Sequence, residues 1–211
     1  MAGQTANYSF DYPTSTDYVK DGATAIETLA DDVDATLFTA LGGAYPGLRL
    51  IKSQTIGSGV SSVSVTGAFS STYENYFITV TGTIASVGGG VCIFSFEDSG
   101  GTALTTGNYN STSYIVMGTG SSVLAASSAN GGGLECGSLQ ATYLNSFGFN
   151  IYAPNTTGYK RSTYISGDSN YHRAGSGYCN NATQFTRFRL LNGSGGTLTG
   201  GTIRVYGMGI S

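Results

Sequence analysis

The 211-residue sequence combines few charges with a moderate apolar content: 10% of its residues are charged and 40% are hydrophobic. This balance excludes an intrinsically disordered chain, because such chains lack the apolar side chains that build a core. Thirty-three glycines without a three-residue period, and only three prolines, exclude collagen and are typical of an all-β chain with many turns. The net charge is −3, but residues 1–41 hold seven acids and one base, whereas residues 42–211 hold five acids and eight bases. The weakly basic second segment lacks the concentrated positive charge of a nucleic-acid-binding protein.

Residues 1–20 are predicted to form an extended N-terminal arm. Tyr12 precedes Pro13, which disfavours helical geometry at Tyr12, and no apolar period follows. The first residues lack the basic and apolar regions of a signal peptide, and no run of about 18 apolar residues predicts a membrane span. We therefore expect synthesis in a cytoplasm and an arm that gains order on a neighbouring molecule.

Residues 22–41 are predicted to form the one helix of the chain, within a helical anchor or oligomerisation segment at 21–43. Asp21 is a suitable N-cap, and Gly42 and Gly43 are suited to ending the helix. The apolar residues recur at steps of three and four, as on one face of a helix. This stripe is too narrow to form a core alone, so it packs either against copies of itself, as an oligomer seam, or against the β domain. The seam residues are Ile26, Leu29, Val33 and Leu37.

Residues 44–211 are predicted to form a β-sandwich domain. After a turn at 44–47, the apolar period changes from 3.6 to 2, and turn-forming residues recur every ten to fifteen positions. About ten short apolar runs follow, and no further helical pattern appears. The predicted fold is therefore mainly β, an antiparallel β-sandwich or jelly roll preceded by an extended arm and one N-terminal α-helix.

The three cysteines are predicted to be buried free thiols. Cys92, Cys136 and Cys179 are odd in number and widely spaced, which suits neither a disulfide framework nor a zinc site. The clustered aspartates at 31–34 lie on the predicted helix and not on a calcium-binding loop. We therefore expect no metal and no cofactor.

The sequence carries little catalytic machinery, and we expect no catalytic residue. His172 is the one histidine, with Asp168 as its nearest acid, and no Gly-x-Ser-x-Gly motif is present. A glycosidase needs two carboxylates across a cleft, and the few acids of the β domain show no pattern that pairs them.

The segment from 167 to 178 has the residues best suited to binding a ligand. Aromatic, amide and charged side chains together bind sugars or polar partners, because aromatic faces stack while polar groups hydrogen-bond. The competing interpretation is an ordinary hairpin whose tyrosines pack inward. The candidate ligand-binding tip consists of Asp168, Tyr171, His172, Arg173 and Tyr178.

Residues 10–41 resemble a segment found near the start of tail-fibre and minor structural proteins of tailed bacteriophages. The resemblance lies in Pro13-Thr, then Asp21-Gly-x-x-Ala-Ile, then Leu29-Ala. It implies a virion component, usually trimeric, with its N-terminal segment near the particle and its β domain pointing outward.

Three functions follow as hypotheses. The first is a tail-fibre or receptor-binding subunit of a virion: a homo-oligomer, expected to be a trimer, that contacts other virion proteins through its N-terminal segment and a host surface glycan through its tip. The second is a capsid-attached head fibre or decoration protein. The third is a carbohydrate-active tail enzyme. No nucleic-acid partner is expected in any of them.

Overall fold

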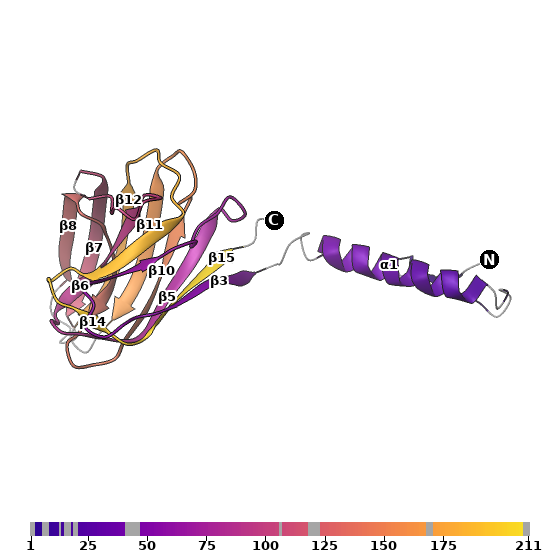
Figure 1. Cartoon of the computed structure of the whole chain (residues 1–211), viewed down its shortest axis with the longest axis horizontal. Coiled ribbons are helices and arrows are strands. Elements are labelled where there is room, and N and C mark those ends of the chain that lie inside the picture. Colours follow the sequence, from indigo (N-terminus) through magenta and orange to yellow (C-terminus); the bar gives the residue numbers. More distant parts are fainter. Residues whose placement is uncertain are drawn as a thin grey trace. The chain divides into compact units, whose positions relative to one another are not determined.

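The computed structural model describes residues 3–5, 9–12, 14, 18, 21–40, 47–105, 107–117, 123–167 and 171–208. The chain divides into two compact units (Figure 1). One comprises Met1–Gly47 with Gly209–Ser211, and the other comprises Leu48–Met208.

The N-terminal unit is built around helix α1, Gly22–Ala40, which confirms the predicted helix. Two short strands precede it, β1 at Gly3–Gln4 and β2 at Asp11–Tyr12, and they pair antiparallel. Strand β2 also packs against α1. The described part of the region predicted as an extended arm therefore folds back on itself and onto the helix.

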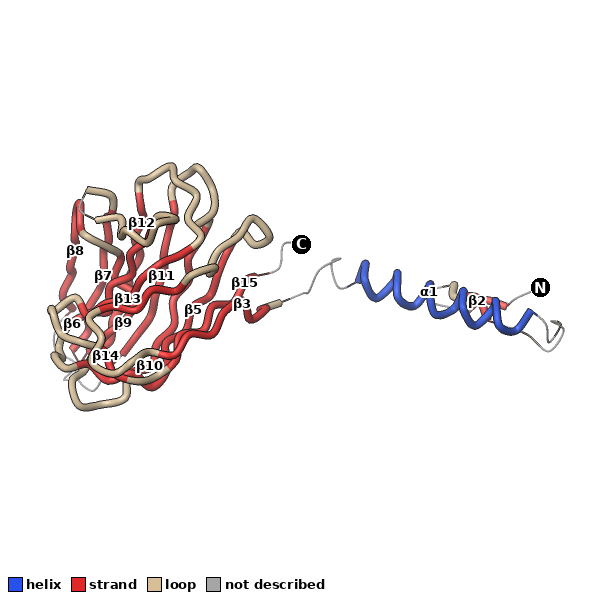
Figure 2. Tube along the Cα trace, in the orientation of Figure 1, coloured by secondary structure: helices blue, strands red, loops and turns tan. Residues whose placement is uncertain are grey.

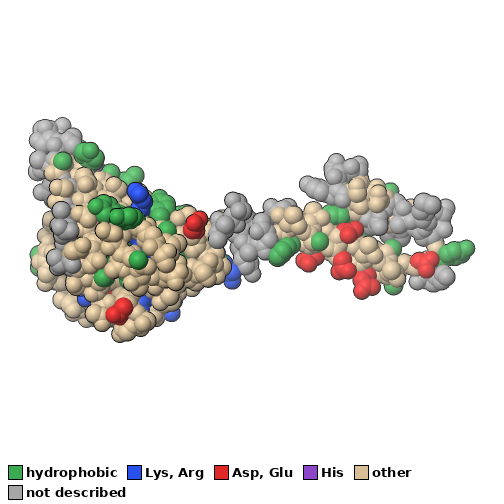
Figure 3. Space-filling model, turned by 90° about the horizontal axis from the view of Figure 1, so that it is seen from above, with side chains coloured by type: hydrophobic (Ala, Val, Ile, Leu, Met, Phe, Trp, Pro, Cys, Tyr) green, Lys and Arg blue, Asp and Glu red, His purple; other side chains and the backbone are tan. Residues whose placement is uncertain are grey.

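The predicted apolar stripe of α1 is largely uncovered within this unit. Ile26 is 63% exposed and Leu37 is 55% exposed, whereas Leu29 and Val33 are half-buried. Acidic side chains gather along the same unit (Figure 3). The helix thus presents apolar and acidic surface together, and the burial that the stripe requires is not complete within its own unit.

The second unit is a two-layer antiparallel β-sandwich, which confirms the predicted fold class. The larger sheet has nine strands, in the order β3-β15-β5-β10-β11-β12-β7-β8, with β14 paired to β5 beside this path. Figure 1 shows this order from β8 at the left to β3 at the right. Its strands are β3 Leu48–Thr55, β5 Asn75–Ala85, β7 Tyr109–Met117, β8 Val123–Gly131, β10 Asn145–Tyr152, β11 Lys160–Gly167, β12 Tyr171–Cys179, β14 Leu198–Thr199 and β15 Thr202–Met208.

The smaller sheet has four strands, in the order β4-β13-β6-β9. Figure 2 labels β6, β9 and β13 of this sheet. They are β4 Ser62–Val65, β6 Gly90–Glu97, β9 Leu134–Leu139 and β13 Arg187–Asn192. Strand β9 packs across β10, β11, β12 and β7 of the larger sheet. One face of the larger sheet is therefore covered.

The core between the sheets is rich in phenylalanine. The Phe94 ring lies 4.8 Å from that of Phe96, 4.9 Å from that of Phe188 and 5.8 Å from that of Phe149, measured between ring centroids. Phe94 and its two neighbours in the small sheet are fully buried. Since aromatic side chains bury much apolar area, this cluster is a main source of the stability of the sandwich.

The three cysteines are free and buried, as predicted. Burial raises the pKa of the Cys179 thiol to about 11 and that of the Cys136 thiol well above its usual value. Both groups are thus held as neutral thiols, which suits a structural role in the core.

Candidate ligand-binding face

The side chains of the larger sheet that point away from the smaller sheet form what we call the outer face. Strand β11 shows the alternation clearly: Lys160, Ser162 and Tyr164 are buried, whereas Arg161 and Ile165 are exposed. Because successive side chains of a strand point to opposite sides, the register of the sheet determines which residues meet on the outer face.

Four residues from four neighbouring strands form one row on this face. Tyr152 of β10 is paired with Arg161 of β11, Arg161 with Tyr178 of β12, and Tyr178 with Asn110 of β7. Neighbouring strands lie about 4.8 Å apart, so the row spans about 15 Å. We call these four residues the Arg161 row.

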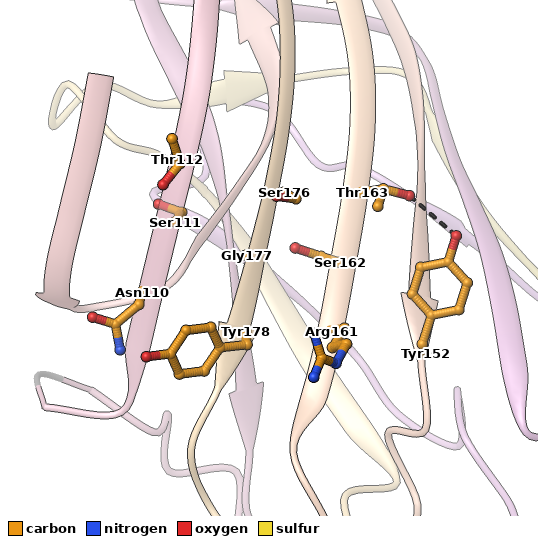
Figure 4. A pocket seen from close by; sticks show the side chains of 10 residues that line it. All are labelled: Asn110, Ser111, Thr112, Tyr152, Arg161, Ser162, Thr163, Ser176, Gly177 and Tyr178. Atoms are coloured by element: carbon orange, nitrogen blue, oxygen red, sulfur yellow. Dashed lines mark hydrogen bonds between the residues drawn. The ribbon is translucent and has the colours of Figure 1, made fainter. Parts of the chain in front are cut away.

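A pocket of about 260 Å³ lies at this row (Figure 4). Hydroxyl groups from the next row of the outer face also line the pocket. In this row Thr163 of β11 is paired with Ser176 of β12, and Ser176 is paired with Thr112 of β7. The lining residues are Asn110, Ser111, Thr112, Tyr152, Arg161, Ser162, Thr163, Ser176, Gly177 and Tyr178.

Hydrogen bonds and ring contacts hold the aromatic parts of the pocket. The Tyr152 Oη atom lies 3.2 Å from the Thr163 Oγ1 atom, and the Asn150 amide donates to the same Oγ1 atom at 3.3 Å. The Tyr178 ring makes an edge-to-face contact with the Tyr159 ring, with 5.7 Å between centroids. In Figure 4 the Tyr178 side chain extends from β12 towards Asn110. Both tyrosines are therefore supported by neighbours while Tyr178 remains 40% exposed.

Glycines allow the sandwich to pack closely beneath this face. A Cβ atom at Gly175 would lie 2.4 Å from a Tyr164 ring carbon, and one at Gly177 would lie 2.7 Å from the Leu134 side chain. Both distances are too short for van der Waals contact, so the inward positions of β12 require glycine. This fixes β12, and with it Tyr178, close to the smaller sheet.

The larger sheet is basic. Its described strands contain no Asp or Glu and six Lys or Arg residues. Lys160 faces inward, where its ammonium donates to the carbonyl oxygens of Gly158 and Asn181, and burial lowers its pKa. On the outer face, Arg204 donates to Thr81 Oγ1 at 3.1 Å. Within the part of the chain that the structure describes, the Arg161 guanidinium makes no hydrogen bond or ion pair.

The structure distributes the predicted tip residues along a strand. Tyr171, His172, Arg173 and Tyr178 all belong to β12, whereas Asp168 lies outside the described residues. His172 and Tyr178 both face outward, but they are six positions apart, which is about 20 Å along a strand. Arg173 alternates to the opposite side and is half-buried. Only Tyr178 of this set lines the pocket.

Sequence reasoning missed the other members of the Arg161 row. Tyr152, Arg161 and Asn110 are far apart in the sequence, and only the register brings them together. The alternation of Lys160, Arg161, Ser162 and Thr163 along a strand was a usable local signal. It could not show which residues of other strands would lie beside Arg161.

The acids of the sandwich that lie nearest its core have structural partners. Glu97 pairs with Arg187 at 2.9 Å and accepts a hydrogen bond from Ser64 Oγ at 2.7 Å. Glu135 accepts a hydrogen bond from the Tyr164 hydroxyl at 2.8 Å, and burial beside this carboxylate raises the pKa of Tyr164. These two carboxylates join strands and sheets together.

Two kinds of feature are absent from the described residues. No group of three or more His, Cys, Asp and Glu side chains that could hold a metal ion occurs among them. Among the same residues, no helix is long and apolar enough to cross a membrane.

Comparison with known proteins gives little similarity. No protein-family model matches the chain, and no curated protein matches it. Among solved structures, the chain is similar to one described as "Structure of infectious bursal disease virus Gt strain", with 11% identity and a TM-score of 0.20. The similarity covers 80% of this chain and 40% of that one. A TM-score this low carries no argument, so the function must be inferred from the surfaces of this chain.

Proposed function

We propose that this chain is a non-enzymatic structural subunit of a bacteriophage virion, of the fibre type, whose outward β domain binds a receptor on the host. The observation that carries the proposal is the contrast between the two units. One is an acidic helix with an uncovered apolar stripe. The other is a rigid sandwich with a basic face and a polar, aromatic pocket.

The helix is suited to assembly. Ile26 and Leu37 lie about 20° apart around the helix axis, at 3.6 residues per turn, and both are more than half exposed. Leu29 and Val33 lie between them along the axis, at about 60° and 20° on the other side of Ile26, and are half-buried. Packing such a stripe against equivalent stripes of other copies buries apolar surface and so stabilises the assembly. We therefore propose that α1 is the oligomer seam, in a trimer, and that the N-terminal segment contacts other virion proteins.

The sandwich is suited to attachment. Its pocket is lined by side chains fixed on four neighbouring strands, and a rigid scaffold limits the entropy lost when a ligand binds. Several copies on one particle multiply a weak affinity through their high effective concentration. A modest pocket on each subunit is therefore sufficient for firm adsorption of a particle to a cell.

Particles that carry variant chains test this proposal. Arg161→Gln combined with Tyr178→Ala should leave particle assembly intact and reduce adsorption to host cells. Arg204→Gln, which changes an arginine of the same face outside the pocket, is the matched control and should leave adsorption unchanged. Normal adsorption together with particles that become fragile to heat or low salt would instead show a capsid-stabilising decoration protein. Absence of the chain from purified particles would refute a virion role altogether.

A further inference from the structure

The Arg161 side chain occupies an unusual place on the outer face. It is exposed, it lies between Tyr152 and Tyr178 in the cross-strand pairing, and its two neighbouring strands supply hydroxyl groups to the same pocket. Exposed arginines on a sheet often pair with a carboxylate across the strands. Here the described strands of the larger sheet offer none.

This arrangement leaves a planar cation available to an external anion. A guanidinium presents two parallel N–H groups that match the two oxygens of a carboxylate, and such charge-assisted pairs are stronger than neutral hydrogen bonds. With no acid on the described strands of this sheet, no neighbouring strand residue competes for Arg161. An external anion that enters the pocket can therefore pair directly with the Arg161 guanidinium.

The remaining lining of the pocket selects what is attached to that anion. Tyr152 and Tyr178 provide aromatic rings on either side of Arg161, and Asn110, Thr112, Thr163 and Ser176 provide amide and hydroxyl groups. Rings stack against the C–H faces of sugars while amides and hydroxyls hydrogen-bond to sugar hydroxyls. The volume of about 260 Å³ lies just below the roughly 300 Å³ of the smallest common ligand pockets, which suits one sugar unit of a longer glycan.

We propose that the pocket binds a carboxylate-bearing saccharide, with the carboxylate on the Arg161 guanidinium and the sugar ring against Tyr178. The inference deepens the proposed function, since it names the chemical class of the receptor that the outward domain binds. A nucleic acid is disfavoured because its affinity depends on several cations tracking a phosphate backbone, and one exposed arginine lies in this pocket.

Titration of the full-length chain with defined oligosaccharides, followed by nuclear magnetic resonance, tests this inference. The probes are trigalacturonate, a sialyl trisaccharide and a hyaluronan tetrasaccharide, each with its methyl-esterified counterpart. We expect at least one acid to bind, with shifts centred on the Arg161 row, and its methyl ester to bind at least about tenfold more weakly, because the ester loses the charge-assisted pair.

Two variants locate the binding. Arg161→Gln should weaken the acid at least about tenfold and leave the ester nearly unchanged, because glutamine keeps a hydrogen-bonding amide and loses the charge. Arg204→Gln should bind the acid as the wild type does. Both substitutions are on the exposed side of the sheet, so the wild-type spectrum of the core residues should be retained in each.

Several results would overturn the inference. Equal affinity for acid and ester would show a neutral saccharide site, and equal binding of triglutamate would show that the sugar is not recognised. No binding by any of the three acids would also overturn it. None of these results would contradict the proposed virion role, which the content and adsorption of particles test separately.

Discussion

The helix seam gives a prediction whose size follows from the exposure of two side chains. Ile26 is 63% exposed and Leu37 is 55% exposed in the single chain. Complete burial of such a side chain contributes roughly 1.5–3 kcal/mol, so burying the exposed share contributes about 1–2 kcal/mol each. In a trimer, six such side chains contribute roughly 6–12 kcal/mol. Replacing both by serine should therefore weaken assembly by at least about three powers of ten.

Sedimentation velocity of the full-length chain measures this effect. The wild type should sediment as an oligomer and the Ile26→Ser, Leu37→Ser double variant as a monomer, while near-ultraviolet circular dichroism shows that the sandwich remains folded. Phe38→Ser is the matched control, because Phe38 is also 63% exposed but lies about 120° around the helix from Ile26. A wild-type monomer would refute the seam, as would a double variant that keeps the wild-type oligomer or a control that dissociates.

Three further predictions concern the sandwich. Phe94→Ala should lower the free energy of unfolding in urea by about 3–5 kcal/mol, because Phe94 is fully buried among other rings. Ile165→Ala is the control, because Ile165 is 80% exposed, and it should change this free energy by less than about 0.5 kcal/mol. Equal effects of the two substitutions would contradict the described core. Burial raises the pKa of Cys179 from 9.0 to about 11, so the thiol should resist alkylation in the native state at pH 8. For the same reason, the free energy of unfolding should hold below pH 9, and the contribution of this thiol to it should be lost as the pH rises through 11. Rapid native labelling would contradict this. His172→Ala should change no hydrolytic activity on host envelope, because we expect none; release of reducing sugar or acyl product by the purified wild type would refute the non-enzymatic proposal.

The sequence was informative wherever one period dominated a long segment. The stripe from Ile26 to Leu37 predicted α1 closely, and the change of apolar period after residues 44–47 predicted the β-sandwich. The apolar residues of strand β7 lie towards its end, from Tyr114 to Met117, but the strand begins at Tyr109. The segment between them, Asn-Ser-Thr-Ser, has the composition of a loop, and it is a strand because it pairs with β12 on one side and β8 on the other.

The candidate site was much less predictable than the fold. The predicted tip residues are close in sequence, but side chains on β12 alternate between two faces and spread along the strand. The row that contains Tyr178 depends on the pairing of four strands, and its members Asn110 and Tyr152 are separated by β8 and β9 in the sequence. Such long-range register is set by turns and core packing together, which local patterns do not encode.

The proposed virion role is tested most directly by locating this chain in the assembled particle by electron cryo-microscopy. The account predicts density for several copies on the particle surface, grouped as oligomers through α1, with the N-terminal unit towards the particle and the outer face of the sandwich exposed to solvent. Particles without such density, or copies whose Arg161 row is buried against another virion protein, would contradict it.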